Sequence, residues 1–367
     1  MKFTCEKALL VSAISLASRT VAPKSTIPCL EGILLRAGVG VQLTGFNLET
    51  GITVKVGAAV TEAGLCVMPA RLFFDIIRKL PDEEVTIEVD QKLRVSIRGG
   101  ASSFQITAMD AEDYPDLPDV NSEKGVKIPQ SALRDMISGT LFSVSENQAR
   151  PILTGCLFEV TDESITMVAV DSSRLARRTW HSENPIGRQM KFVVPSAALR
   201  EVEKMLEDSD AEMSFTLGSK HLLFEIGDAT LVCRLLEGEF IDWRRVVPTK
   251  NETILTANVS ELTASIERVS LIVSEKIKSP VRCVFGDNMA DFRTINTIGS
   301  AHDTCAIAGN GNELEIGFNC RFLLDALRAV PGDEVVLELQ NGLSPIIFTP
   351  ADQKYDFSYM VLPVRLH

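Results

Sequence analysis

Val67–Val89, VMPARLFFDIIRKLPDEEVTIEV, is a pattern that the chain repeats twice more. The second version is Val193–Leu217, VVPSAALREVEKMLEDSDAEMSFTL, and the third is Gly317–Leu339, GFNCRFLLDALRAVPGDEVVLEL. Each version contains a short apolar run, a turn residue, a helix of about ten residues and an alternating strand. About one third of the 367-residue chain separates successive copies, so the repeating unit has the size of a domain.

A longer helix is predicted near the start of each third of the chain. Its apolar positions recur at the same helical offsets in all three copies, which is the spacing of a helix that buries one face. The three sets are Leu10, Ala13, Ile14, Ala17 and Val21; Leu133, Met136, Ile137, Thr140 and Val144; and Leu262, Ser265, Ile266, Val269 and Val273. We therefore predict three copies of one α+β domain, each with two helices on one face of an antiparallel sheet. The predicted domains are 1–123, 124–249 and 250–367.

The composition is that of a globular protein. With 45% hydrophobic and 23% charged residues, each third can bury its own core. No apolar run approaches the roughly 18–20 residues of a membrane span, and Glu6 and Lys7 stand where a signal peptide would be apolar. We expect a cytoplasmic protein with its cysteines buried as thiols, because their spacing fits neither a metal site nor an obvious disulfide framework. The cysteines are Cys5, Cys29, Cys66, Cys156, Cys233, Cys283, Cys305 and Cys320.

The charge is unevenly distributed along the chain. The net charge is −12, yet the predicted helices and the loops that follow them carry more basic than acidic residues. Three corresponding loops, Ala22–Pro28, Asn147–Pro151 and Lys276–Pro280, each carry Lys or Arg. A basic helical layer on an acidic protein suits a surface that holds a polyanion electrostatically. The alternative is an ordinary solvated helix face, because no interleaved aromatic residues or glycine-rich anion loop accompany the cations.

The sequence contains no recognisable catalytic or metal-binding arrangement. The histidines, His181, His221, His302 and His367, lie outside any H-E-x-x-H or triad pattern. Asp171–Arg174 contains two serines without a nucleophile elbow or a paired histidine. Gly309–Asn312 lacks the lysine of a phosphate loop and is predicted to be a hairpin turn. We therefore expect no enzyme activity, no catalytic residue, no metal and no cofactor.

The C-terminal segment Tyr359–Leu366, YMVLPVRL, is almost entirely apolar. It is either part of a sealed core or the lip of a groove for an apolar peptide. In the second case Met360 and Leu362 would lie exposed on one face of the last strand.

Several motifs taken together resemble the β subunit of bacterial DNA polymerase III, the sliding-clamp family. They are the opening MKFT, Thr26–Leu30, Pro69–Phe73, Asp113–Asp116, Phe240–Pro248, Glu315–Asn319 and the closing LPVRL. The resemblance covers the whole chain. It implies a DNA sliding clamp, a non-catalytic processivity factor of DNA replication. Two chains would close head to tail into a homodimeric ring whose helices line the hole.

The resemblance also implies sequence-independent contact with double-stranded DNA. It assigns this contact first to Lys24, Arg71, Arg150, Pro151 and Ile152. The positions of Lys276, Lys278 and Arg321 in the basic layer add three more cations. A closed ring would tether its partners without a tight contact that stops sliding. Those partners would be the DNA polymerase III alpha subunit, the clamp loader and other proteins with a clamp-binding motif, with no membrane partner.

By the same resemblance, a groove between the second and third domains binds the partner peptide. The matching positions are Val170, Ser172, Ser173, Arg174, Leu175, Ile241, Arg245, Val246, Ser344, Met360, Leu362, Pro363, Val364 and Arg365. Well-known members have Gly-His in place of Ser172-Ser173 and Pro in place of Ile241. A serine Cβ restricts the backbone where glycine is free. These departures leave open whether the groove keeps the usual peptide preference and whether this is a main or a second clamp.

Ring closure is assigned by the resemblance to two edges of the molecule. Phe104 and Ile106, on the last strand of the first domain, would meet Leu271 and Ile272 in the third domain of a second copy. An edge strand that finds a partner is also protected from aggregation.

Two other classes of function stay open on the residues alone. An enzyme built on triplicated domains would need a catalytic cluster, and turnover or a bound metal would reveal it. A protein-interaction scaffold would not depend on DNA. Retention on nicked circular DNA that is lost on linearisation distinguishes a topological clamp from such a scaffold.

Overall fold

The computed structural model describes residues 1–81, 83–120, 125–273 and 279–366. The chain forms two compact units, one of Met1–Ser131 with Ala197–Leu235 and one of Ala132–Ser196 with Leu236–His367. The second third of the chain therefore contributes to both units.

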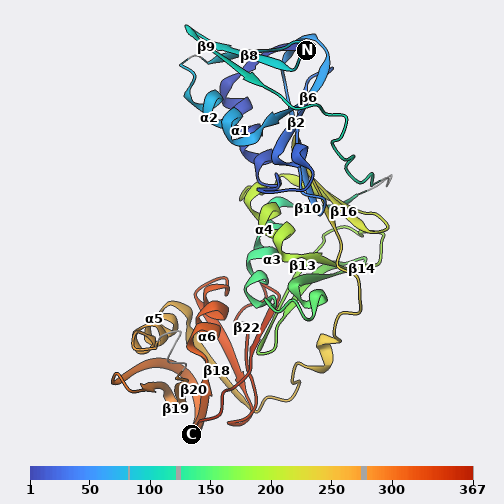
Figure 1. Ribbon diagram of the computed structural model, residues 1–367. Helices are drawn as coiled ribbons and strands as arrows, with labels where there is room; N and C mark the ends of the chain where they lie inside the picture. The colour runs from blue at the N-terminus through green and yellow to red at the C-terminus, as the bar shows by residue number, and fades with distance from the viewer. Residues whose placement is uncertain (82, 121–124, 274–278, 367) are drawn as a thin grey trace. The chain divides into compact units, whose positions relative to one another are not determined.

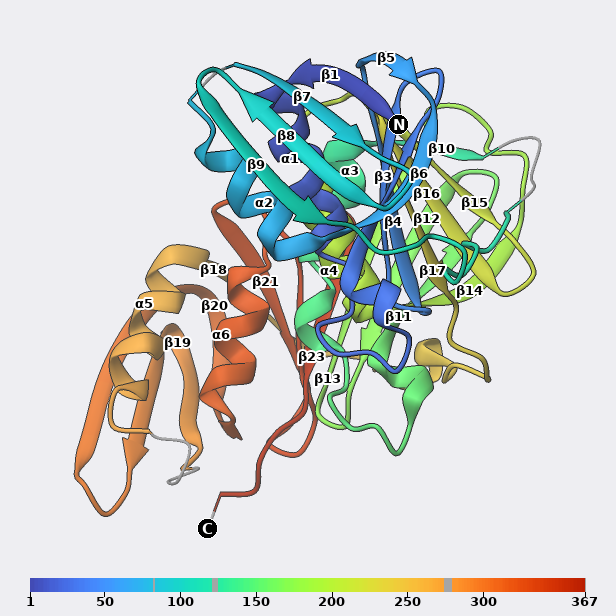
Figure 2. The same ribbon diagram turned by 45° about the horizontal axis from the view of Figure 1, so that its top comes forward.

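The first unit combines two antiparallel sheets with helices. Helices α1 (Lys7–Ser18) and α2 (Ala70–Lys79) lie side by side (Figure 2), and all but the first residue of α4 (Ser196–Met205) belongs to this unit. The five-stranded sheet has the order β5 (Ala59–Glu62), β1 (Lys2–Glu6), β7 (Glu84–Val89), β8 (Arg94–Gly99), β9 (Ser102–Thr107). The eight-stranded sheet has the order β10 (Val126–Pro129), β15 (Glu212–Leu217), β16 (His221–Ile226), β17 (Ala229–Arg234), β4 (Thr50–Val56), β3 (Val41–Phe46), β2 (Gly32–Ala37), β6 (Gly64–Pro69).

The second unit contains a ten-stranded antiparallel sheet. Helices α5 (Val259–Ser270) and α6 (Cys320–Arg328) lie next to each other in it (Figure 1). Most of α3 (Gln130–Ser138) also belongs to this unit. The strand order is β14 (Met190–Pro195), β11 (Gly155–Val160), β12 (Ser164–Val170), β13 (Arg174–His181), β23 (Phe357–Val361), β22 (Ile346–Pro350), β21 (Glu334–Leu339), β18 (Thr253–Asn258), β20 (Ser300–Phe318), β19 (Val281–Ile295). Single turns of 3₁₀ helix occur at η1 (Pro28–Glu31), η2 (Leu141–Ser143), η3 (Pro151–Thr154) and η4 (Trp243–Arg245).

The predicted helical stripes are buried in the structure. On α1 and α5 the first four positions of each stripe face the core. The predicted continuation is wrong in all three copies, because α1 ends at Ser18 before Val21, α3 at Ser138 before Thr140 and Val144, and α5 at Ser270 before Val273. Thr140 and Val144 are nevertheless buried. The Thr140 hydroxyl donates to the Met136 carbonyl at 2.8 Å, which gives this helix end a side-chain partner in place of another turn.

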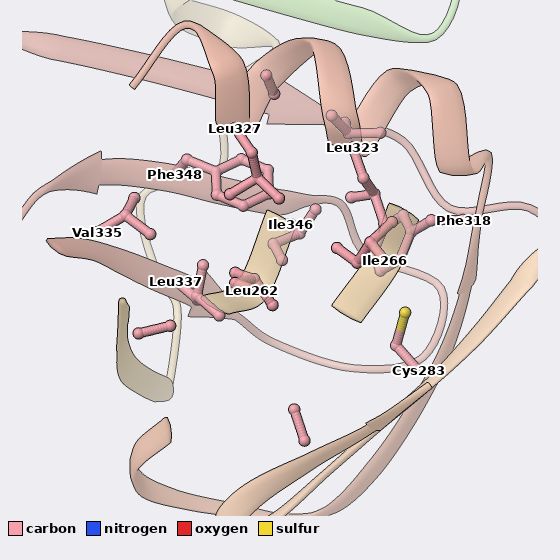
Figure 3. Packing of buried hydrophobic residues seen from close by; sticks show 14 of the residues in the cluster. Leu262, Ile266, Cys283, Phe318, Leu323, Leu327, Val335, Leu337, Ile346 and Phe348 are labelled. Carbon is pink, nitrogen blue, oxygen red and sulfur yellow. The ribbon is translucent and has the colours of Figure 1, made fainter. Parts of the chain in front are cut away.

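The core of the last third shows why these residues form an α+β layer. Leu262 and Ile266 on α5 and Leu323 and Leu327 on α6 lie in one buried cluster with apolar side chains of strands β21 and β22 (Figure 3). Asn258 and Asn319 cap the two helices, because their side chains accept hydrogen bonds from the backbone N–H groups of Glu261 and Arg321, each at 3.0 Å.

Strands from neighbouring thirds of the chain pair in both units. We call the pairing of β4 with β17 the first joint and that of β13 with β23 the second joint. Val54 lies opposite Ala229, the first residue of β17, and Arg178 lies opposite Phe357, the first residue of β23. Val54 and Arg178 therefore occupy corresponding places.

The prediction of a hairpin turn at Gly309–Asn312 is wrong. These residues lie within β20, where Asn310 pairs with Asp287 at an irregularity of the β19–β20 register. Gly309 and Asn312 have positive φ angles of 115° and 55°, which Gly and Asn tolerate better than other residues. The turn that joins the two strands is Asn296–Gly299 instead, closed by a hydrogen bond from the Asn296 N–H to the Gly299 carbonyl at 3.0 Å.

None of the helices in the described part of the chain is long and apolar enough to cross a membrane.

Candidate functional site

An apolar cluster covers one face of β11, β12, β13, β14, β22 and β23 in the second unit. Alternate residues of a strand share a face, and the cluster is continuous because Leu157 pairs with Val168 and Met360 pairs with both Leu175 and Ile347. We call this cluster the apolar patch. Its strand members are Leu157, Val168, Val170, Leu175, Val193, Ile347 and Met360, all buried.

The segment 236–247, which we call the covering segment, crosses the apolar patch. Its Leu236 N–H donates to the Val193 carbonyl at 3.0 Å, and Phe240 is buried against the patch. Ile241, Trp243 and Val247 are partly buried there. Apart from η4 the covering segment has no helix or strand, so side chains hold much of it in place.

The turn 171–174 borders the apolar patch where β12 ends and β13 begins. Asp171 Oδ1 accepts hydrogen bonds from the N–H groups of Ser173 at 2.7 Å and Arg174 at 2.9 Å. The Arg174 guanidinium contacts Asp171 at 3.0 Å and Asp325 at 2.6 Å, and it lies 4.4 Å from the Phe322 ring centroid. Two carboxylates and a ring thus fix the Arg174 side chain.

The C-terminal segment joins this turn to β20. The Leu362 N–H donates to the Ser173 carbonyl and the Val364 N–H to the Gly317 carbonyl, both at 2.8 Å. Met360 is buried in the patch, whereas Leu362 and Val364 are exposed. The expectation that Met360 and Leu362 would both be exposed is therefore wrong for Met360, because its side chain lies in the apolar patch that Phe240 and Trp243 pack against.

The structure brings most of the predicted groove residues to one place. Val170, Leu175, Ile241 and Met360 belong to the apolar patch or pack on it. The exposed members around them are Ser172, Arg245, Val246, Leu362, Val364 and Arg365, while Pro363 lies between the two anchored residues of the C-terminal segment. The hydrogen bonds of Ser344 go to Asn341 and Gln340 in its own loop.

Sequence reasoning missed several residues of this site. They include Phe240, Trp243 and Val247 on the covering segment and Leu157, Val168, Val193 and Ile347 on the strands. Phe240 and Trp243 stand in the motif that carries the family resemblance, where an aromatic residue in a linker is a recognisable signal. Ile347 belongs to the buried run Ile346–Phe348. Without a known strand register, such an apolar run predicts core but does not show that Ile347 belongs to this site.

The basic residues of the helical layer fall into two groups. Arg19, Arg78, Lys204, Arg268 and Arg328 form ion pairs with acidic residues. The predicted DNA contacts Lys24, Arg71, Arg150 and Arg321 are exposed and form no ion pair with another described residue. Pro151 and Ile152 begin η3 directly after Arg150. Lys276 and Lys278 lie outside the described residues.

On the described helices, three further exposed cations form no ion pair and were not predicted as DNA contacts: Lys79, Arg134 and Arg200. Arg71 and Arg321 are the second residues of α2 and α6. A cation in the first turn of a helix opposes the helix dipole. These two arginines therefore contribute little to helix stability and remain available to an external anion.

The predicted dimer contacts lie at sheet edges or beside them. β9 is an edge strand, and its Phe104 and Ile106 lie opposite Ile97 and Val95 of β8. Leu271 is 83% exposed just after α5. The Asn296 side chain donates to the Ile272 carbonyl at 2.8 Å. The exposed Ile295, the last residue of edge strand β19, and Ile298 in the turn after it therefore belong to the same region.

The cysteines are buried as free thiols. Burial raises the pKa of Cys5 to about 11 and that of Cys66 and Cys233 to about 12, which keeps these thiols protonated and unreactive. In the described residues no group of three or more His, Cys, Asp or Glu side chains is arranged to hold a metal ion.

Comparison with known families matches nearly the whole chain, in three parts. The family models of the DNA polymerase III beta subunit match residues 1–118 with the N-terminal domain, 127–242 with the central domain and 244–365 with the C-terminal domain.

Individual relatives agree with these matches. The beta sliding clamp of Staphylococcus epidermidis is 30% identical over 378 residues, covering 100% of both chains. The DNA polymerase sliding clamp of Bacillus subtilis has a TM-score of 0.95 at 30% identity, again over 100% of both chains. A putative DNA polymerase III beta subunit from Eubacterium rectale has a TM-score of 0.94 at 31% identity and 99% coverage of each chain.

Proposed function

Because this chain belongs to the DNA polymerase III beta-subunit family and functions as a sliding clamp, we propose that two copies close into a ring around duplex DNA. The chain consists of three tandem clamp domains of mixed α+β structure. Sliding clamps of this family are non-catalytic processivity factors. For the domains we propose the boundaries 1–123, 124–249 and 250–367.

Ring closure joins β9 of one copy to the β19 edge of the other, with the apolar side chains beside these edges buried between them. Phe104 and Ile106 supply one side of this contact, and Leu271 and Ile272 supply the other. The exposed Ile295 and Ile298 extend the second side. Unpaired strand edges with apolar side chains are the surfaces that a symmetric oligomer covers.

DNA contact is made by the exposed cations that no carboxylate neutralises. On the described helices and the loops next to them, these cations are Lys24, Arg71, Arg150 and Arg321, together with Lys79, Arg134 and Arg200. Pro151, Ile152, Lys276 and Lys278 complete the proposed contact. Cations that reach phosphates without reading bases bind every sequence alike, so the ring can slide.

Partner proteins bind at the apolar patch and its exposed rim. The DNA polymerase III alpha subunit, the clamp loader and other proteins with a clamp-binding motif would each insert a short apolar peptide there. The exposed side chains of Val246, Leu362 and Val364 beside a buried apolar cluster support this proposal. A clamp must reach the chromosome, which supports a cytoplasmic location.

The observation that carries the ring proposal is the pair of apolar strand edges on the first and third domains. The test is retention of the protein on nicked circular DNA after loading by a clamp loader, measured before and after linearisation. A closed ring stays on the circle and slides off the linear molecule. Equal retention on both would contradict the proposal.

The variant Ile272→Ala tests the interface itself. We expect it to weaken the dimer in analytical ultracentrifugation and to shorten retention on circular DNA, because a buried isoleucine contributes roughly 2–5 kcal/mol. Ile14→Ala is the control for a general loss of stability, because Ile14 is buried on α1 and has no role in the proposed interface. An Ile272→Ala protein that stays dimeric at nanomolar concentration would refute the assigned interface.

A further inference from the structure

The covering segment forms one wall of the proposed peptide site, yet few backbone contacts hold it. Its Leu236 N–H bonds to β14, and the other backbone bonds of the segment run within the turn around Trp243. Ile241, Arg245 and Val246, which belong to the proposed site, lie on this irregular stretch. Their positions therefore depend on side-chain anchors.

Glu159 on β11 provides the polar anchor. Its carboxylate accepts hydrogen bonds from Trp243 Nε1 at 3.3 Å and from Arg244 Nη1 and Nη2 at 3.2 and 2.7 Å. Lys191 Nζ lies 3.4 Å away on β14, and the Glu159 side chain is only 13% exposed. The Arg244 guanidinium also lies 4.3 Å from the Trp243 ring centroid. One carboxylate thus binds two consecutive residues of the covering segment.

The charge of Glu159 is matched to this role. Burial alone raises the pKa of the carboxyl, but the hydrogen bonds from Arg244, Trp243 and Lys191 outweigh it and hold the pKa below its ordinary value. The ionised form is therefore kept at neutral pH, where charge-assisted hydrogen bonds are the stronger kind.

We propose that Glu159 is a positioning residue, which holds the covering segment against β11 and so sets the affinity of the apolar patch for partner peptides. The inference rests on the proposed peptide site. Glu159 itself need not touch the peptide. It fixes Trp243 and Arg244, and through them the neighbouring Ile241, Arg245 and Val246.

The experiment measures binding of a fluorescent peptide that carries the clamp-binding motif of a DNA polymerase III alpha subunit. Glu159→Gln keeps the shape of the side chain and removes the charge, and we expect it to weaken binding about tenfold, the value of one charge-assisted hydrogen bond. Trp243→Phe removes the indole N–H and makes the aromatic side chain smaller, and we expect a loss of at least about threefold. The matched control is Glu315→Gln, which breaks a cross-strand pair with Arg282 at 2.5 Å on β20 and β19 and leaves the covering segment untouched.

Two further readouts separate positioning from a general loss of structure. The chain has two tryptophans, so Trp180→Phe leaves Trp243 as a reporter of the covering segment. In this background Glu159→Gln is expected to increase acrylamide quenching of Trp243. The peptide affinity of the wild type should fall as the pH drops through the lowered pKa of Glu159, whereas the Glu159→Gln protein should lack this step.

The outcomes distinguish this inference from the proposed function. If the wild type does not bind the peptide, or if the rim variant Leu362→Ser binds as tightly as the wild type, the peptide site is assigned wrongly. If Leu362→Ser weakens binding while Glu159→Gln and Trp243→Phe match the wild type in affinity and quenching, the positioning role is overturned. Weaker binding by both variants with an unchanged control supports it.

Discussion

The two joints share the same strand pairing, but the side chains at corresponding places differ: the first joint has an apolar residue where the second has a buried ion pair. In the first joint Val54 is buried, and Ser12 on α1 lines the same hollow of about 500 Å³. In the second joint Arg178 stands at the place of Val54, and its side chain is only 2% exposed. Asp135 on α3, at the place of Ser12, accepts from Arg178 Nε at 2.7 Å and Nη2 at 2.6 Å.

The Arg178 guanidinium also lies 5.5 Å from the ring centroids of both Tyr355 and Phe357. A joint filled by apolar side chains loses stability gradually as atoms are removed. A joint filled by a buried ion pair instead depends on both partners, because either one alone is an uncompensated charge. The duplicated fold tolerates both solutions, but their responses to mutation differ.

The linkers beside the two joints differ in a related way. In the first domain Tyr114 is buried with Leu117 nearby, and the Tyr114 hydroxyl donates to the Thr44 carbonyl at 3.2 Å. In the second domain Phe240 takes the corresponding place. Like Tyr114, it follows an acidic residue, but it has no hydroxyl. The first linker thus closes its apolar cluster with a hydrogen bond, while the second relies on Glu159 and leaves Val246 exposed.

The largest expected effect comes from breaking the ion pair of the second joint. Asp135→Ala leaves the buried Arg178 guanidinium without its carboxylate, and we expect the free energy of unfolding to fall by roughly 2–3 kcal/mol. The value is at the low end for a buried pair because the Asp135 side chain is 51% exposed. Thermal and urea unfolding measure it.

The first joint supplies the controls for that prediction. Ser12→Ala should change stability by less than about 0.5 kcal/mol, as surface substitutions usually do. The double variant Asp135→Ser with Arg178→Val copies the first joint into the second, and it should recover most of the stability lost in Asp135→Ala. A double variant as unstable as the single one would contradict the view that the unpaired charge causes the loss.

A smaller effect is expected from the hydroxyl that closes the first linker. Tyr114→Phe removes the hydrogen bond to the Thr44 carbonyl and should lower the free energy of unfolding by about 1 kcal/mol. Tyr355→Phe is the matched control, because its ring contact with Arg178 persists without the hydroxyl. Equal stability of the two variants would show that the first linker is held by apolar contact alone.

The smallest effect concerns pH at the second joint. Asp356 contacts Arg177 at 2.6 Å and His181 at 2.8 Å. Burial raises the pKa of Asp356, but the hydrogen bonds and charges of Arg177 and His181 outweigh it and hold the pKa below its ordinary value. Its stabilisation is therefore present above the unfolded pKa and is lost as the pH falls through the lowered folded value.

Asp356→Asn should accordingly destabilise the protein at neutral pH by less than about 1 kcal/mol and have no effect at a pH below both pKa values. Asp228→Asn, at the corresponding place of the first joint, is the comparison, because Asp228 forms no ion pair with a described residue. A difference between wild type and Asp356→Asn that persists in acid would refute the electrostatic origin. Unfolding midpoints measured across the pH range decide the matter.

Periodicity predicted the repeated parts of the fold, and it did so for a physical reason. The stripes on α1, α3 and α5 are local patterns, and the side chains of Leu10, Leu133 and Leu262 are buried as the spacing indicates. The end of α3 was missed because Thr140 is a plausible stripe member whose hydroxyl bonds back to the helix.

Features made by distant residues lay beyond such patterns. Asp135 and Arg178 are 43 residues apart, and only the strand register of β13 brings the arginine under α3. The pieces of the apolar patch come from both sides of the 236–247 segment, so the family resemblance placed Met360 beside Leu175 while periodicity did not. The anchoring by Glu159 had no sequence signal, because an isolated Glu in an alternating strand is typical of a solvated face.

The shared ladder of β13 and β23 has a practical consequence for dissecting this protein. Deleting the last third of the chain would leave β13 with a bare edge from Arg174 to Arg178 and would uncover Leu175, which Met360 now shields. Bare edges with apolar side chains recruit strands from other molecules. A truncated fragment would therefore aggregate, and its aggregation would be mistaken for a loss of partner binding. Single substitutions avoid this problem.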